Sequence, residues 1–409
     1  MQILNCPAGL GRPGFKRTGF IFAGQTDQVR RYQMIDFALH INYNEFKIGS
    51  EIPLLLKLRL KNLFRHTPKT KGKILIVDTC IIGDFLATLP ALRAFIEASG
   101  QSVDIIVSPP LKSLAKAIKG VDRVFTAKSV YSRQIENVGG GEAIPKEYSH
   151  VLVMRISQDA YSILDGIKYS TIKTYDIPYY RYFGHLVKNI LLKKKVRQWR
   201  EINYEIIGIP EPAKKAGFTD IFSFTENDYA EVAARPELGG NGKKVMIHTG
   251  SGWNIKLWEN AKWTELLSRI NKLGDFSFIF TGGGAFEEES FNHIQKNLDF
   301  KTYSLVNKVD LRETMLAMRL CDYFIGIDSG PRNMAHLADL RSISLLGPAP
   351  KNFMPINEED IVIDKFDCRC KSLFYLHKIS GMQKISVDEV LDCFKKLLKT
   401  RPARNAAVH

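Results

Sequence analysis

The sequence predicts an α/β fold made of two Rossmann-like, doubly wound parallel-sheet halves that face each other across a cleft. Three observations predict it. Apolar strand patterns alternate with helical patterns from residue 73 onward, a polar glycine-rich interval at 235–244 interrupts them, and the alternation restarts at 245. Alternating strands and helices favour parallel sheets covered on both faces, because each parallel strand pair needs a crossover connection. The length of 409 residues also suits two domains.

In the first half, short apolar runs predict strands and amphipathic runs predict helices. The expected strands are 73–78, 103–108, 123–127 and 150–156, and the expected helices are 84–99 and 111–119. Gly100 directly follows the first of these helices, and glycine is the residue most often found just after a helix end.

The second half repeats this pattern. The expected strands, some with their following turns, are 245–250, 276–284, 322–330 and 342–348. The expected helices are 259–273, 286–297, 311–320, 331–339 and a last amphipathic helix at 387–400. We therefore expect an N-terminal extension at 1–70, a first domain at 71–234, a second domain at 245–385, and a C-terminal helix and tail at 386–409. Ligands of such sheets bind outside the carboxyl ends of the strands.

The charge balance indicates anionic partners. Lys and Arg total 58 against 43 Asp and Glu, a net charge of +15, which attracts nucleic acid, anionic lipid or acidic glycolipid. Segments 51–66 and 185–200 mix leucines with lysines and arginines and predict basic amphipathic helices able to lie on an anionic bilayer. The alternative is a helix docked on the core with a solvated basic face. Nucleic acid is not expected as a partner, because no recognition-helix signature or repeated basic–aromatic pattern occurs.

Several classes of protein are disfavoured. No apolar run reaches the roughly 18 residues of a membrane span, and the N-terminus lacks the pattern of a signal peptide, so we expect a cytoplasmic protein. Six cysteines without a framework predict buried thiols, and the C-x-C step at 368–370 does not match zinc spacing, so we expect no metal. The G-x-G-x-x-G run at 9–14 follows no strand and is set aside.

Three turns of the second half carry residues suited to an anionic ligand. The loop 248–256 combines glycines with Lys256, which suits an anion held by backbone N–H groups and one cation. The run 280–290 places Glu287 after three glycines, where a carboxylate can accept from ribose hydroxyls. In 326–336 a proline at the first helical position leaves N–H donors free. An ordinary loop lysine, a charged first helical turn and a helix cap are the respective alternatives.

The stretch "IVDTCIIGDFLATLPALRAF" at 76–95 places a carboxylate, Asp84, where a strand pattern gives way to a helical one. Folding alone would accept Ser, Asn or Thr at such a junction. The carboxylate therefore favours a chemical role, with a helix cap as the alternative.

Together these stretches resemble a known family. "KILIVDTCIIGDFLATLPALRAF", "IHTGSGWNIKLWENAKWTELL", "FTGGG" and "GIDSGPRNMAHLADLRSISLLGPAP" are similar to the successive signatures of the ADP-heptose:lipopolysaccharide heptosyltransferases, glycosyltransferase family 9, over about 72–395. The resemblance implies a GT-B architecture with an N-terminal acceptor domain, a C-terminal donor domain and a final helix returning to the first half. It also implies a metal-independent, inverting transfer of heptose from ADP-heptose to lipopolysaccharide at the cytoplasmic face of the inner membrane.

The resemblance further implies roles for individual residues. Asp84 would be the general base, which suits a carboxylate that takes the proton of an acceptor hydroxyl. The donor-binding residues would be Thr249, Gly250, Ser251, Lys256, Glu287, Asp328, Ser329, Gly330 and Asn333, with Gly83 and Thr79 near the acceptor. The implied partners are a nucleotide-sugar donor, a lipid-linked anionic glycan and the inner-leaflet surface, with no cofactor and no metal. Without a metal, cations and helix N-termini must stabilise the leaving diphosphate.

The sequence also departs from the family pattern. Thr249 stands where the family usually has Pro, and Asn333 stands where it usually has His. The extension 1–70 is foreign to the pattern. Two alternatives therefore stay open: a family member that uses another nucleotide sugar, and a catalytically idle protein that binds sugar nucleotides.

Overall fold

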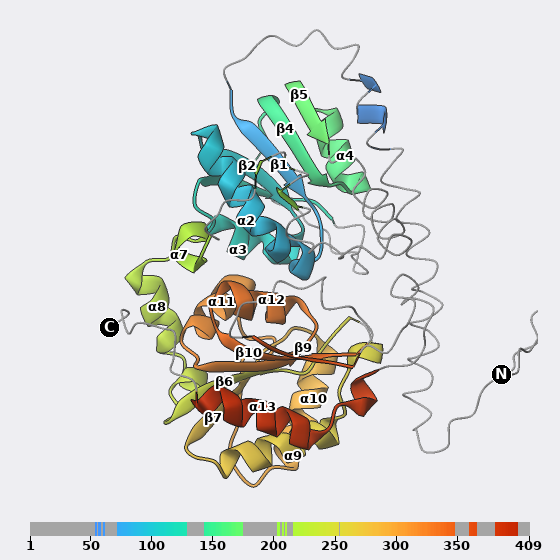
Figure 1. Cartoon of the computed structure of the whole chain (residues 1–409). Helices are drawn as coiled ribbons and strands as arrows, with labels where there is room; N and C mark the ends of the chain where they lie inside the picture. The colour runs from blue at the N-terminus through green and yellow to red at the C-terminus, as the bar shows by residue number, and fades with distance from the viewer. Residues whose placement is uncertain are drawn as a thin grey trace, which may run out of the picture.

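The computed structural model describes residues 54, 56–58, 60, 61, 72–128, 143–174, 203, 204, 207, 209, 210, 216–252, 254–347, 360–365 and 381–399. In Figure 1 these residues form an upper and a lower α/β half. The predicted basic segment at 185–200, the C-x-C step at 368–370 and nearly all of the extension 1–70 lie outside the described residues.

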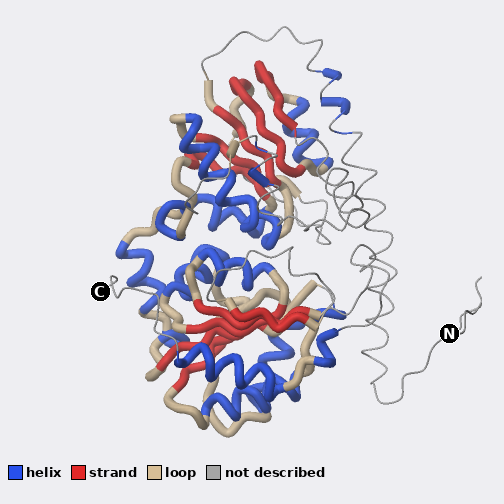
Figure 2. Tube along the Cα trace, in the orientation of Figure 1, coloured by secondary structure: helices blue, strands red, loops and turns tan. Residues whose placement is uncertain are grey.

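The first half is built on a parallel sheet, drawn in red in the upper part of Figure 2. Its five strands have the order β3-β2-β1-β4-β5. Its strands are β1 (Ile74–Asp78), β2 (Val103–Val107), β3 (Val121–Thr126), β4 (Glu147–Arg155) and β5 (Lys168–Thr174). Its helices are α2 (Ile82–Ser99), α3 (Lys112–Lys116), preceded by a 3-10 turn at Pro109–Leu111, and α4 (Gln158–Asp165). The strand β5 was not expected, because its sequence KYSTIKT is largely polar.

The second half is built on a parallel six-stranded sheet in the order β11-β10-β9-β6-β7-β8. Its strands are β6 (Lys243–His248), β7 (Phe276–Phe280), β8 (Tyr303–Ser304), β9 (Tyr323–Ile327), β10 (Arg341–Leu346) and β11 (Ile361–Asp364). Its helices are α9 (Asn260–Asn271), α10 (Ala285–Lys296), α11 (Leu311–Arg319), α12 (Gly330–Leu337) and α13 (Val387–Lys399), with 3-10 turns at Asn254–Lys256 and Gly381–Lys384. The predicted pair of parallel α/β sheets is therefore confirmed.

Helix α2 begins earlier than its sequence pattern predicts. Ile81 is the extended residue before the helix, with φ −79° and ψ 165°, so Gly83 and Asp84 lie in the first helical turn rather than in a turn before it. A carboxylate in a first turn interacts favourably with the unpaired N–H groups there. The helix ends at Gly100, whose φ of 65° is the left-handed conformation that glycine adopts easily.

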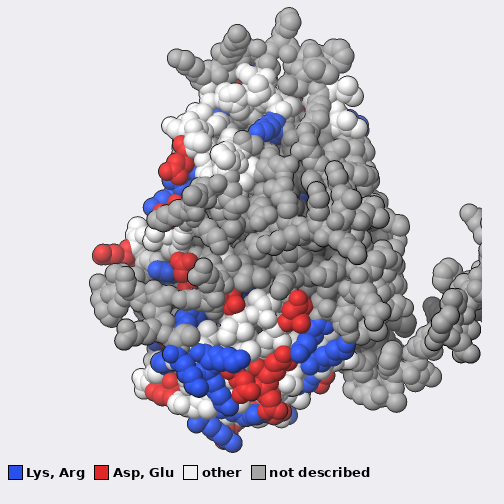
Figure 3. Space-filling model, viewed as in Figure 1, with Lys and Arg blue, Asp and Glu red and all other residues white. Residues whose placement is uncertain are grey.

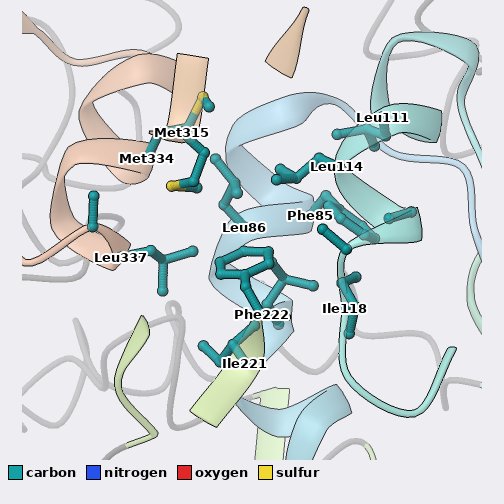
Figure 4. Packing of buried hydrophobic residues seen from close by; sticks show 14 of the residues in the cluster. Phe85, Leu86, Leu111, Leu114, Ile118, Ile221, Phe222, Met315, Met334 and Leu337 are labelled. Atoms are coloured by element: carbon teal, nitrogen blue, oxygen red, sulfur yellow. The ribbon is translucent and has the colours of Figure 1, made fainter. Parts of the chain in front are cut away.

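The two halves share one continuous hydrophobic cluster. In Figure 4, Leu86 of α2 lies beside Met315, Met334 and Leu337, which come from α11 and α12 of the second half. Figure 1 likewise shows α2 and α3 facing α11 and α12. Burial of this apolar surface favours contact between the halves at about 25 cal/mol per Å².

The predicted linker at 235–244 is shorter in the structure. The helices α7 (Phe218–Ile221) and α8 (Glu226–Ala233) and a 3-10 turn at Pro236–Leu238 precede β6. Helix α7 contacts the first half, where the Lys119 amide donates to the Ile221 carbonyl at 2.9 Å. Helix α8 and the residues after it are held to the second half by three ion pairs, Arg312–Asp228, Arg235–Glu313 and Lys308–Glu237. The segment that connects the two halves is therefore held to both of them.

The described part of the C-terminal segment, helix α13 (Val387–Lys399), packs within the second half, whereas the family resemblance implies a return to the first half. Within the described residues, α13 packs on α9 and β10 of the second half. Its Phe394 is fully buried, with ring centroids 5.5 Å from Phe276 and 5.3 Å from Tyr323. The apolar stripe of α13 matches the outer face of the second sheet, which would otherwise be exposed.

Six described residues of the predicted basic segment 51–66 support its core-docking alternative. These residues are helical; Leu54 and Leu58 are buried at 6% and 0% exposure, in the cluster of the first sheet, while Leu56 and Leu60 point outward. Lys61 pairs with Asp165 of α4. Binding of this segment to a bilayer stays a prediction.

The charged surface seen in Figure 3 mixes both signs. Over the second half, blue Lys and Arg lie among red Asp and Glu rather than in one patch of a single sign. None of the helices in the described ranges is long and apolar enough to cross a membrane.

We expect Phe394→Ala to lower the free energy of unfolding by about 3–5 kcal/mol, because it removes a fully buried aromatic ring. Chemical denaturation followed by circular dichroism measures this. The matched control on the exposed face of the same helix, Lys396→Ala, should change stability by less than about 0.5 kcal/mol. Equal losses in the two variants would contradict the packing of α13 described above.

Candidate functional site

Three loops of the second half meet at one edge of its sheet. They follow β9, β6 and β7, which are adjacent in the sheet order, so their carboxyl ends lie side by side. The loops predicted from sequence at 248–256, 280–290 and 326–336 therefore converge in space. Ligands of open parallel sheets bind at such an edge.

Glu287 packs between two of these loops. A Cβ atom placed on Gly250 would lie 2.1 Å from Oε1 of Glu287, and one placed on Gly282 would lie 2.7 Å from its Cγ. Gly282 also has φ 155°, where other residues are strained. Burial raises the pKa of the Glu287 carboxyl above its usual range. The glycines thus make room for a carboxylate at the sheet edge.

Lys256 and Asp328 join the first loop to the third. The Lys256 ammonium lies 2.5 Å from Oδ2 of Asp328 and 3.5 Å from its backbone carbonyl. Both side chains are 16% exposed, so water screens the pair only partly. A cation is thereby held beside the start of α12.

No side chain caps the start of α12, whose first N–H group is that of Gly330. Ser329 is extended, with φ −161°, and its hydroxyl donates to the Ile327 carbonyl at 3.1 Å instead of capping the helix. The residue before α2, Ile81, provides no side-chain cap either. The first-turn N–H groups of a helix carry a partial positive charge and attract anions. The two helix starts lie together, since a Cβ on Gly330 would approach Cγ2 of Ile82 to 2.9 Å.

A hydrogen bond joins these two helix starts. The side-chain amide of Asn333 donates from Nδ2 to the Gly83 carbonyl at 3.1 Å. Asn333 is 8% exposed, and its Oδ1 has no hydrogen-bond partner. The next residue along α2 is Asp84, which is half-buried and whose own carbonyl accepts from the Thr88 hydroxyl at 2.9 Å. The predicted base therefore lies where the halves meet.

Thr79, predicted to lie near the acceptor, is placed beneath the turn. It is 2% exposed, and its hydroxyl donates to the Arg155 carbonyl at 3.4 Å. One residue later, the Cys80 carbonyl accepts from the Ser108 hydroxyl at 2.8 Å. These contacts anchor the connection between β1 and α2 to its neighbouring strands.

Sequence reasoning missed a second carboxyl behind this turn. Asp78, the last residue of β1, is fully buried, and neither carboxylate oxygen has a hydrogen-bond partner. Loss of hydration raises the pKa of Asp78 to about 6, and the negative charge of Asp84 adds to the rise. Cys80 and Arg155 lower the pKa in part, although neither lies within hydrogen-bonding geometry of the Asp78 carboxylate. The signal was present in "KILIVD", where a carboxylate ends an otherwise apolar strand.

A buried polar network under α12 was also missed. Arg332 is fully buried and donates to the Ser344 hydroxyl at 3.0 Å and to the Asp360 carboxylate at 3.2 Å. Asp360 also accepts from the Ser342 hydroxyl at 2.6 Å. Arg332 therefore holds α12 on β10 from inside.

Among the described residues, no three His, Cys, Asp or Glu side chains gather closely enough to hold a metal ion. The cysteines of the C-x-C step lie outside the described ranges.

Comparison with known proteins finds the family model of glycosyltransferase family 9 (heptosyltransferase), which matches residues 179–379. The chain is similar to lipooligosaccharide heptosyltransferase 2 of Campylobacter jejuni, 24% identical over 40% of this chain and 54% of the relative. It is also similar to lipopolysaccharide heptosyltransferase 1 of Salmonella typhimurium, 22% identical over 68% of this chain and 88% of the relative. The chain thus spans about half the length of the first of these relatives.

Among solved structures, the chain is similar to E. coli ADP-heptose LPS heptosyltransferase II. The TM-score is 0.59 at 14% identity, over 80% of this chain and 98% of that chain. This likeness concerns the fold, and it confirms the predicted GT-B-like arrangement of the two parallel-sheet halves.

We expect Asp78→Asn to stabilise the protein at neutral pH. Burial raises the pKa of Asp78 from 3.8 to about 6, so the folded protein favours the protonated carboxyl. The contribution of Asp78 to folding stability is therefore fully present below pH 3.8 and is lost as the pH rises through 6. The stability of Asp78→Asn minus that of wild type should therefore grow by about 2 kcal/mol between pH 4 and pH 7. Urea denaturation at both pH values measures the difference.

A buried but partnered carboxylate provides the control for this experiment. Asp104 accepts from Arg123 and Tyr148, both at 2.7 Å, so Asp104→Asn should destabilise the fold at pH 7. A pH-independent difference between Asp78→Asn and wild type would contradict the proposed burial of an unpaired carboxyl.

Proposed function

Because this chain belongs to glycosyltransferase family 9 (heptosyltransferase), we propose that it moves heptose or a related sugar from ADP-heptose to a lipopolysaccharide-type acceptor. The proposed transfer inverts the anomeric carbon and needs no metal. The observation that carries the proposal is the meeting of two helix starts. The first turn of α2 brings Asp84, and the first turn of α12 brings the Gly330 N–H and the nearby Lys256.

Asp84 is the proposed general base. Its carboxylate takes the proton of the acceptor hydroxyl while that oxygen forms a bond to the anomeric carbon of the donor. The bond between this carbon and the diphosphate breaks, and the leaving group departs with the electron pair. One carboxylate suffices, because a diphosphate needs no protonating acid, unlike the leaving groups in glycoside hydrolysis.

The second half is proposed to hold the donor. Lys256 and the Gly330 N–H at the start of α12 face the charge that develops on the diphosphate. Asp328 holds Lys256 in place before the donor arrives, through the 2.5 Å ion pair. The remaining proposed donor contacts are Thr249, Gly250, Ser251 and Ser329 around the diphosphate, Glu287 at the ribose, and Asn333 near the sugar.

The acceptor is proposed to be a lipid-linked anionic glycan reached at the inner face of the bacterial inner membrane. A net charge of +15 favours such a partner and such a surface. Peripheral attachment through basic amphipathic segments is part of this proposal.

A different nucleotide sugar is the second candidate donor. The observation that favours it is Asn333, which stands where the family usually has His and whose side-chain amide donates from Nδ2 to the Gly83 carbonyl. Offering ADP-heptose and other ADP-, GDP- and UDP-sugars singly, with release of the nucleotide measured, separates the two candidates.

Asp84→Asn should lower turnover by about 10²- to 10⁴-fold, because it removes the proton acceptor and preserves the shape of the side chain. Nucleotide release from the preferred donor in the presence of acceptor measures this. The exposed carboxylate variant Asp122→Asn should keep wild-type turnover. If Asp84→Asn, folded as the wild type, retains near-normal turnover, the base role is wrong.

Lys256→Met should weaken ADP binding by about 10- to 100-fold, because a charge-assisted contact is lost and Asp328 is left facing the diphosphate. In the double variant Lys256→Met/Asp328→Asn part of the affinity should return, since the repelling charge is gone. Calorimetry in EDTA measures both values, with exposed Lys272→Met as the control. An unchanged affinity for ADP in Lys256→Met would contradict the proposed contact between Lys256 and the diphosphate. ADP binding that requires a divalent cation would contradict the proposed metal independence.

A further inference from the structure

The hydrogen bond between Asn333 and Gly83 lies between the proposed base and the proposed donor-binding residues at the start of α12. We propose that Asn333 is a positioning residue: from the donor half, it holds the peptide that carries Asp84. This inference rests on the proposed function for its catalytic consequence. The contact itself is a property of the protein alone.

The roles of the two atoms of the Asn333 amide follow from the chemistry of their neighbours. The Gly83 carbonyl can only accept a hydrogen bond, so the group 3.1 Å from it is the Nδ2 donor. This orientation leaves Oδ1 buried and without a partner. A buried oxygen without a hydrogen bond is unfavourable by about 1–3 kcal/mol, so folding alone gives little reason for an amide here.

The bonded carbonyl belongs to the same peptide group as the N–H of Asp84. Peptide groups are planar, so a shift of the Gly83 carbonyl moves the backbone of Asp84 with it. On the far side of Asp84, its own carbonyl is held by the Thr88 hydroxyl at 2.9 Å. The second half therefore holds the backbone on the N-terminal side of Asp84, and helix α2 itself holds the backbone on its C-terminal side.

Close approach of the helix starts makes the contact possible. A Cβ on Gly83 would lie 3.2 Å from Nδ2 of Asn333 and 3.8 Å from the Cα of Gly330. A Cβ on Gly330 would in turn meet Ile82 at 2.9 Å. Glycine at both positions lets α2 and α12 approach, and a methyl group at Gly83 would press directly on the amide.

One helix then serves two parts of the site. Helix α12 carries the Gly330 N–H, proposed to face the diphosphate, in its first turn and Asn333 one turn later. The base is therefore placed relative to the donor by a single rigid element, and only when the halves are in contact. Misplacement of a reacting group by about 1 Å can lower a rate about 10²-fold.

The test is a double-mutant cycle on the full-length chain with Asn333→Ala, Gly83→Ala and both together. Each single variant should lower kcat by about 10- to 100-fold while the Kd for ADP stays within about threefold, because the donor seat is intact. Amide hydrogen exchange at residues 85–88 should become faster in both. The double variant should be no worse than the poorer single one, since both remove the same contact. Asn227→Ala on the exposed face of α8 is the matched control.

Three results would overturn the inference. These are a Kd for ADP that rises in proportion to the loss of kcat/KM, strictly additive effects in the cycle, and unchanged exchange at 85–88 in Asn333→Ala. A wild-type chain that turns over none of the offered nucleotide sugars refutes the proposed function and the catalytic consequence with it. In that case, the hydrogen-exchange measurements still decide whether Asn333 stabilises the first turn of α2.

Discussion

Close contact between the first turn of α2 and the first turn of α12 is the constraint on which the rest of the structure depends. Gly83 and Gly330 permit it, since a Cβ on either would press on Asn333 or Ile82. Below these turns the hydrophobic cluster runs without a break from Leu86 into α11 and α12. Close packing of this cluster joins the two halves in the structure.

This contact also organises the charges. Helix starts carry partial positive charge, and the two that meet here lie beside one cation, Lys256, and one half-buried carboxylate, Asp84. Asp78 lies deeper, without hydrogen bonds, and its pKa is raised by burial. A group that folding disfavours, held directly behind a proposed catalytic turn, fits the general finding that perturbed carboxyls gather at functional sites.

The central strands of both sheets were predictable, and three of the four edge strands were not. The central strands β1, β6 and β9 each contain a buried apolar run and were expected within one or two residues of that run. The strands missed, β5, β8 and β11, all lie at sheet edges. An edge strand is half-covered or short, so its apolar pattern is weak. The docking of α13 was predicted wrongly, because an amphipathic stripe shows that a helix is buried on one side but does not identify its partner.

By itself, the sequence determined the alternation of strands and helices, the two parallel sheets and the three glycine-rich loops at strand ends, because hydrophobic period and turn residues are local properties. It also singled out Asp84 and Lys256 as candidates by residue type. Only the tertiary structure decided that Asn333 reaches Gly83, 250 residues away in the chain, and that Asp78 is buried without a partner. Such contacts depend on how the two halves pack, and packing of side chains distant in sequence leaves no periodic signal along the chain.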